Sequence, residues 1–188
     1  LTIDFTRARE YSLAGTITGD TNNNDRILLA GPVVINATQV DFAASRRTAD
    51  IDTDGNGVAD LIGAVLDMFA LSVTNAELVV DQIAAMTLTG QLALVRVSAA
   101  GQSNSRYSAL KMGNVTVTAS TESTTFGLTG SMDIDRLDYN AFDTNVAGLK
   151  RLDWTKAVDL DGDGDADLLN PGALLTGAPN LTIDLPGS

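Results

Sequence analysis

Alternation of apolar and polar side chains, interrupted by short segments rich in Asp, Asn and Gly, most limits what this chain can fold into. A period of two predicts β-strands, because successive side chains of a strand point to opposite faces of a sheet. The composition agrees, since the chain has 21 Thr but only three Glu and three Lys, and Thr favours strands. We expect strands at residues 11–18, 27–30, 33–42, 87–97, 107–111, 114–119, 125–135 and 180–185.

These strands predict a mainly β protein, either an antiparallel β-sandwich or a short β-solenoid-like stack. A length of 188 residues suits a single domain, and a hydrophobic content of 44% is enough for a core. Aromatic residues make up only 5% of the chain. We therefore expect one β-rich domain over residues 1–188, with Ala, Val, Leu and Ile filling its core.

Two segments depart from this alternation and predict short helical pieces. Residues 60–71 carry apolar side chains at positions 61, 62, 65, 66 and 69. This spacing is typical of an amphipathic helix, and Asp60 is a suitable N-cap. A second helical turn is expected at residues 170–175, where Asn170 would be the cap and Pro171 the first helical residue.

The chain contains a weak internal duplication. Residues 52–61 (DTDGNGVADL) align without gaps to residues 159–168 (DLDGDGDADL), at an offset of 107 positions. Chance similarity in a chain rich in Thr, Ala, Asp and Leu is the alternative explanation. We interpret the match as a β-rich unit used twice, over about residues 1–100 and 101–188.

Both aligned segments follow the pattern D-x-D-x-[DN]-G-x-x-D, which is typical of a calcium-binding loop. Side chains at positions 1, 3 and 5 turn towards one point, Gly at position 6 permits the sharp turn, position 7 offers its carbonyl, and Asp at position 9 closes the site. Oxygen-only ligation favours Ca²⁺ over Mg²⁺, and we expect about two ions; a solvated Asp/Gly turn is the alternative. The predicted ligands are Asp52, Asp54, Asn56, Val58 and Asp60 in the first loop, and Asp159, Asp161, Asp163, Asp165 and Asp167 in the second.

Two further ligand frames are weaker. Starting the first loop at Asp50 leaves no closing acid at position 12, and the EF-hand glutamate is also missing, since Gly63 occupies its position. Residues 20–25 (DTNNND) have the right alternation but no glycine. A hairpin turn is therefore expected there.

Charge and missing residue types exclude several functional classes. The chain has 24 acidic and 12 basic residues, and nine of the acids lie within residues 50–60 and 159–167. A net charge of −12 argues against nucleic-acid binding and against binding to an anionic membrane. The chain has no His and no Cys, which removes Ser-His-Asp chemistry and thiolate nucleophiles. No apolar run is long enough for a spanning helix, and we expect neither enzymatic activity nor membrane insertion.

The two aspartate nonapeptides resemble the calcium loops of FG-GAP and VCBS repeats, thrombospondin type 3 repeats and dockerins. The spacing of 107 residues differs from the shorter repeat of propeller blades, and long β-rich stretches separate the loops where dockerins have paired helices. With its Thr-, Ala- and Val-rich strands, the whole chain resembles modules of large secreted bacterial adhesins and surface proteins.

This resemblance implies a non-catalytic, calcium-stabilised structural or adhesive module at the bacterial cell surface, in contact with neighbouring modules or identical subunits. One alternative is a subunit of a self-assembling surface filament or layer, because LTID occurs at both residues 1–4 and 181–184 and a terminal strand can pair with a neighbouring sheet. Another is a calcium-dependent carbohydrate-binding domain that presents Tyr139 or Trp154 to a glycan. A buried or half-buried position in the core is the alternative, and the more usual one, for such an aromatic side chain.

Overall fold

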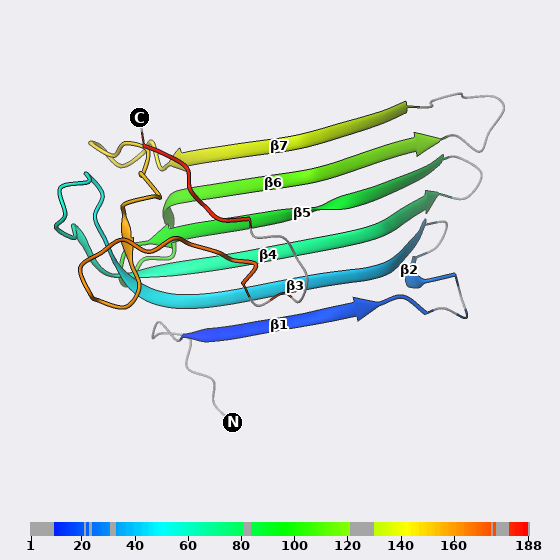
Figure 1. The fold of residues 1–188 in the computed structure, drawn as a ribbon, viewed down its shortest axis with the longest axis horizontal. Coiled ribbons are helices and arrows are strands. Elements are labelled where there is room, and N and C mark those ends of the chain that lie inside the picture. The colour runs from blue at the N-terminus through cyan, green and yellow to red at the C-terminus, as the bar shows by residue number, and fades with distance from the viewer. Residues whose placement is uncertain are drawn as a thin grey trace.

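The computed structural model describes residues 10–20, 22, 24–30, 33–80, 84–120, 130–173, 175 and 181–187. These residues form one open antiparallel sheet with the strand order β1-β3-β4-β5-β6-β7, in which β2 and β8 also pair with β3 (Figure 1). The mainly β, antiparallel fold class is therefore confirmed. The strands are β1 (Tyr11–Thr18), β2 (Arg26–Ala30), β3 (Val33–Ile51), β4 (Leu61–Val80), β5 (Ala84–Ser98), β6 (Ser105–Ser120), β7 (Gly130–Phe142) and β8 (Val158–Asp159).

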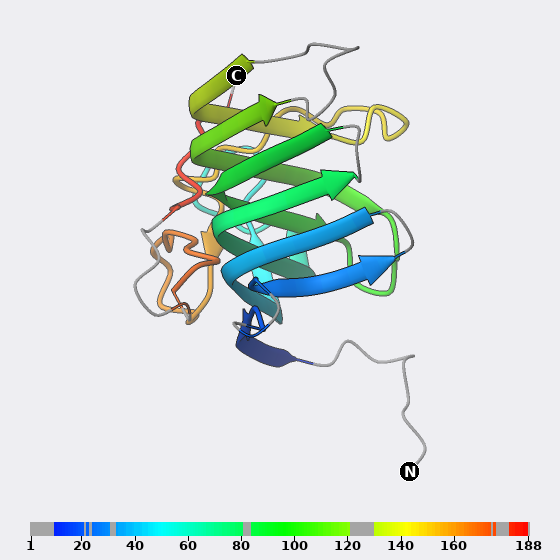
Figure 2. The same cartoon turned by 90° about the vertical axis from the view of Figure 1, so that its right-hand side faces the viewer.

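The described residues after β7 pack on one face of this sheet and form a second layer (Figures 1 and 2). Within the described residues this layer is mostly irregular chain, so the two layers are one sheet and one segment rather than two sheets. We call residues 143–187 the C-terminal segment. Its anchors are buried apolar side chains that lie on the inner side of the segment: Leu152, Trp154, Ala157, Val158, Leu169, Ile183 and Leu185.

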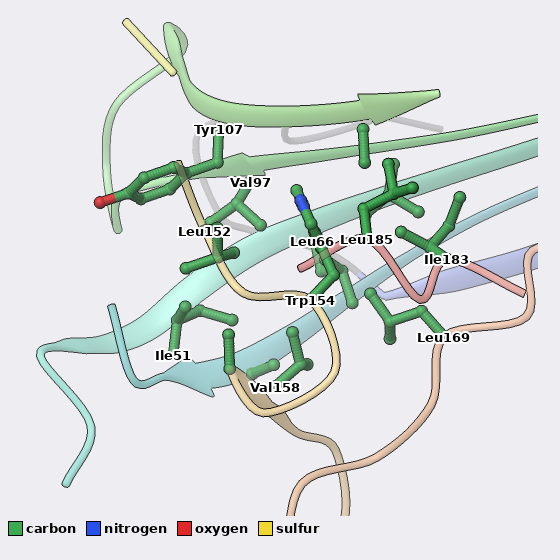
Figure 3. Close-up of a cluster of buried hydrophobic side chains, with 14 of the residues drawn as sticks. Ile51, Leu66, Val97, Tyr107, Leu152, Trp154, Val158, Leu169, Ile183 and Leu185 are labelled. Carbon is green, nitrogen blue, oxygen red and sulfur yellow. The ribbon is translucent and has the colours of Figure 1, made fainter. Parts of the chain in front are cut away.

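The core lies between the C-terminal segment and alternate residues of the central strands (Figure 3). Leu66 of β4, Val97 of β5 and Tyr107 of β6 share this face, because Leu66 pairs with Val97 and Val97 pairs with Tyr107. Each of these side chains is almost completely buried. The sheet side of the core is therefore built by the period-two alternation of neighbouring strands.

Trp154 is the largest side chain of this core and is fully buried. Its indole Nε1 donates to Oδ1 of Asn140 on β7 at 3.0 Å. The amide of Asn140 in turn donates to the carbonyl oxygens of Leu152, at 2.9 Å, and Pro186, at 3.1 Å. One side chain of an edge strand thus binds the C-terminal segment at three points.

The prediction of a helix at residues 60–71 is wrong, because residues 61–71 belong to strand β4. Ala64 and Leu66 face the C-terminal segment, while Val65 and Phe69 alternate with them on the other face of the strand. A strand that is apolar on both faces has a nearly continuous apolar run, and such a run also contains the helical spacing. The described residues contain no helix that is long and apolar enough to cross a membrane.

The C-terminal predictions also need correction. In the segment 170–175 the described residues 171–173 form a turn instead of a helix, and backbone hydrogen bonds run from Ala173 to Asn170 and from Leu175 to Gly172. Asn170 does act locally as predicted for a cap, since its Oδ1 accepts from the N–H of Gly172. In the described part of the strand predicted at 180–185, Ile183 forms only an isolated bridge with Leu169.

We predict that Trp154→Ala lowers the free energy of unfolding by about 3–5 kcal/mol, because it opens a cavity between the sheet and the C-terminal segment. Leu168→Ala is the matched control, since Leu168 lies in the same segment but is exposed, and its loss is expected to stay within about 0.5 kcal/mol. Urea unfolding followed by circular dichroism measures both changes. Equal losses in the two variants would contradict this packing.

Candidate metal centre

The first aspartate loop connects β3 to β4 and is closed by a backbone hydrogen bond from Asp60 to Ile51 at 2.8 Å. Gly55 and Gly57 have φ angles of 77° and 83°. A Cβ atom at either position would meet nothing within 4 Å. These glycines are therefore required by the left-handed backbone of the loop and not by lack of space.

Asp52 organises this loop through backbone hydrogen bonds. Its Oδ1 accepts from the N–H groups of Asp54, Gly55 and Asn56, and its Oδ2 accepts from Gly57 at 2.7 Å. At the other end of the loop, Oδ2 of Asp60 accepts from both the backbone N–H and the hydroxyl of Thr53. The two carboxylates are thus held in place by the chain that runs between them.

The second loop, residues 159–167, repeats this geometry. Asp159 accepts from Gly162 at 2.7 Å and from Gly164 at 3.0 Å, as Asp52 does from the corresponding glycines. Asp167 accepts from the N–H of Leu160 at 2.7 Å, in the place where Asp60 accepts from Thr53. The sequence match between the two loops therefore extends to their backbone conformation, while duplication of the whole unit stays a prediction.

Three carboxylates converge in each loop. In Asp52, Asp54 and Asp60, and again in Asp159, Asp161 and Asp167, one oxygen per residue lies within 4.8 Å of the others. Oxygens bound to one Ca²⁺ at about 2.4 Å can be at most about 4.8 Å apart. Both triads could therefore hold a metal ion.

The other predicted ligands lie outside these triads. Oδ1 of Asn56 accepts from the N–H of Val58 at 2.7 Å, and Oδ1 of Asp163 accepts from the N–H of Asp165 at 2.8 Å. These side chains brace the turn. Ligand roles for Asn56, Val58, Asp163 and Asp165 stay predictions.

The two loops are neighbours in space although they are 107 residues apart. In the pairing of β3 with β8, Asp50 lies opposite Asp159 and Ile51 lies opposite Val158. The backbone N–H of Asp52 also donates to the carbonyl of Ala157 at 2.9 Å. Both triads therefore begin at the same short antiparallel ladder, and a cavity of about 140 Å³ lies between the loops.

Basic residues of the C-terminal segment lie beside the first loop, which the sequence did not predict. Lys150, Arg151 and Lys156 line a cleft of about 470 Å³ together with Asp52 and Asp54. Lys156 also lines the cavity between the two loops. No local pattern indicates this neighbourhood, because it results from the folding of the segment back onto the sheet.

The pKa values of the first aspartate in each loop lie below the ordinary value. For Asp52, partial burial opposes ionisation, but four backbone N–H groups of the loop outweigh it and lower the pKa. For Asp159, the N–H of Gly162 is the main cause of the lowered pKa. Oriented N–H groups stabilise the ionised carboxylate, so both residues carry the charge that a cation needs.

The remaining predicted site residues, which are the two weaker ligand frames and the two aromatic side chains, lie outside the triads. Asp50 accepts from the N–H of Gly63 at 2.7 Å. Asp20 and Arg26 form an isolated bridge, and Asn24 and Asp25 lie in a turn. The strands on either side, β1 and β2, both pair with β3 and not with each other, so the predicted hairpin between them does not form. Trp154 is fully buried and cannot contact a glycan, which corrects that prediction, whereas Tyr139 is exposed.

Of the two LTID sequences, the copy at residues 181–184 lies within the described part of the chain. Residues 1–4 lie outside the described residues. In the copy at residues 181–184, Ile183 is fully buried against the sheet of its own chain. This copy is therefore part of the core in the chain as described.

Comparison with known proteins found no matching family model, no matching curated protein and no matching solved structure.

We predict that, in chelator, the free energy of unfolding decreases as the pH falls below about 4. A carboxylate whose pKa is lower in the folded chain stabilises it above the unfolded pKa, and this contribution is lost as the pH falls through the folded pKa. Urea unfolding across a pH series measures the decrease, which should be smaller in Asp52→Asn/Asp159→Asn than in the control Asp133→Asn. Carboxyl titrations by NMR that place Asp52 and Asp159 at or above the ordinary pKa would contradict this.

Proposed function

We propose that the chain is a calcium-stabilised, non-catalytic structural or adhesive module, and that each triad binds one Ca²⁺. The observation that carries the proposal is the repeated loop geometry, in which three carboxylate oxygens converge at two separate places. Three carboxylates so close together repel one another, and a bound divalent cation relieves that repulsion. Two ions would change the formal charge from −12 to −8.

The donor set supports Ca²⁺ over softer metals. The chain has no His and no Cys, and ligation by carboxylate and carbonyl oxygens suits hard cations. Ca²⁺ accepts six to eight oxygens in irregular geometry, which matches loops whose remaining ligands would be carbonyls and water. The N–H groups that already orient Asp52 and Asp159 reduce the cost of ordering the loops when the ion binds.

Calcium in these loops would fasten the C-terminal segment to the sheet. The first loop starts directly after β3 and the second starts at Asp159, the last residue of β8, and these two strands pair with each other. An ion in the second loop also fixes the chain between Val158 and Leu169, two anchors of the core. Because the ions bind the folded loops, mass action shifts the equilibrium towards the folded state.

A place outside the cell suits weak calcium sites. Modules in extracellular settings bind Ca²⁺ with dissociation constants of about 10⁻⁴–10⁻³ M, and the sequence resemblance to bacterial adhesins and surface proteins points in the same direction. We therefore propose a secreted or cell-surface location, with neighbouring modules or identical subunits as partners.

We predict that 10 mM Ca²⁺ raises the thermal midpoint by about 3–10 °C per site relative to chelator. With dissociation constants of about 10⁻⁴–10⁻³ M, the stabilisation is about 1.4–2.7 kcal/mol per site, and each kcal/mol corresponds to about 2–4 °C for a chain of this size. Differential scanning calorimetry with CaCl₂ and with chelator measures the shift. An unchanged thermal midpoint would contradict the proposal.

Two amide substitutions separate ion binding from folding. In Asp54→Asn and Asp161→Asn, the new side chain keeps an oxygen that can accept the existing turn hydrogen bond, but the charge is lost. Each variant should retain about half of the calcium-dependent shift, and the double variant should retain little of it. Asp133→Asn removes the same charge from an exposed site on β7 and should keep the full shift.

A further inference from the structure

The face of the sheet opposite the C-terminal segment is also apolar. The strand register is continuous from β1 to β7 over the middle of the sheet, so alternate residues fall into rows that cross all six strands. We call the following two rows the open face. One row is Leu13, Ala44, Phe69, Leu94, Leu110 and Tyr139, and the next is Gly15, Phe42, Leu71, Leu92, Met112 and Leu137.

Nothing in the described part of the chain packs across these rows. The hydrophobic cluster formed with the C-terminal segment includes no residue of the open face, and the segment lies on the other side of the sheet (Figure 2). Leu13 and Tyr139, at the two edges, are 55% and 56% exposed. Aromatic and aliphatic side chains thus form a contiguous surface that no described residue covers.

This surface is large enough for a specific interface. Six strands spaced about 4.8 Å apart span about 24 Å, and the stretch from Tyr11 to Ile17 covers about 20 Å along the strands. The flat area of this region, which includes the row of Tyr11, Arg46, Asp67 and Arg96 beside the apolar rows, is about 500 Å². Two such faces in contact would bury about 1,000 Å², the size that a specific protein interface requires.

A row of charges borders the open face and is self-complementary. Arg46 and Asp67 form an ion pair at 2.6 Å across β3 and β4. Arg96 lies opposite Asp67 on β5, but no ion pair of Arg96 occurs among the described residues. A second copy turned over the first can bring an Asp67 to this arginine.

We propose that the open face binds the open face of a second copy of this chain, around a two-fold axis that runs parallel to the strands between β4 and β5. This axis passes through the middle of the strand order, so β4 lies over β5 of the second copy and β1 lies over β7. Asp67 then faces Arg96 of the second copy, and Leu13 faces Tyr139 of the second copy. The stack is an aligned β-sandwich with one sheet from each chain.

Sedimentation velocity from about 10 µM to 1 mM, with calcium and with chelator, tests for the dimer. We expect a concentration-dependent dimer, and Leu13→Lys should raise the dissociation constant at least about 100-fold because the two-fold axis places two lysines in the apolar interface. Leu168→Lys is the control. Leu168 is exposed and lies in the C-terminal segment, on the other side of the sheet from the open face, so the dissociation constant of this variant should equal that of the unmodified chain.

Disulfide crosslinking tests the axis itself, because the chain has no cysteine of its own. Leu13 and Tyr139 are five strand spacings apart within one sheet, so a Leu13→Cys/Tyr139→Cys variant cannot close a disulfide inside one chain. Under mild oxidation it should form covalent dimers, whereas each single-cysteine variant should stay mostly monomeric on a non-reducing gel.

Three results would overturn the proposal. The first is an unmodified chain that stays monomeric up to 1 mM. The second is dimerisation only after deletion of residues 1–9, which would assign the cover of the open face to that segment. The third is crosslinking of the single-cysteine variants as efficiently as the double variant, which would rule out the two-fold axis.

Discussion

The two-residue ladder between β3 and β8 is the contact on which the rest of this structure depends. It joins strands that are more than a hundred residues apart in sequence, with Asp50 opposite Asp159 and Ile51 opposite Val158. Ile51 and Val158 are both fully buried, so the ladder leads from the metal loops directly into the core. The same contact therefore brings two aspartate loops together and begins the packing of the C-terminal segment on the sheet.

The charged aspartate loops adjoin the place where the C-terminal segment packs on the sheet. The sheet by itself has two apolar faces, and one of them is covered by a segment that has little regular hydrogen bonding of its own in the described residues. Such a segment has few backbone hydrogen bonds to offset the entropy of ordering it. Apolar anchors such as Trp154 supply part of the stability, and cation binding in the adjoining loops would supply more. The acid excess of the sequence is then mostly the charge of two cation sites.

The sequence predicted the fold class and both loops, because each depends on local pattern. Alternation with a period of two is visible without any tertiary contact, and the aspartate spacing determines which carboxylates converge. The sequence misled at residues 60–71, where both faces of β4 are apolar and the run contains a helical spacing by coincidence. It also did not predict that Lys156 lies between the loops, since that position follows from long-range packing that no local pattern records.

Counting the bound ions tests the central claim most directly. In isothermal titration calorimetry with CaCl₂, we expect about two Ca²⁺ per chain, about one in Asp54→Asn or Asp161→Asn, and two in Asp133→Asn. Absence of binding up to 10 mM would contradict it, as would a stoichiometry that is the same in the loop variants and the control. Either result would mean that the two triads lie in solvated turns and that calcium does not stabilise this fold.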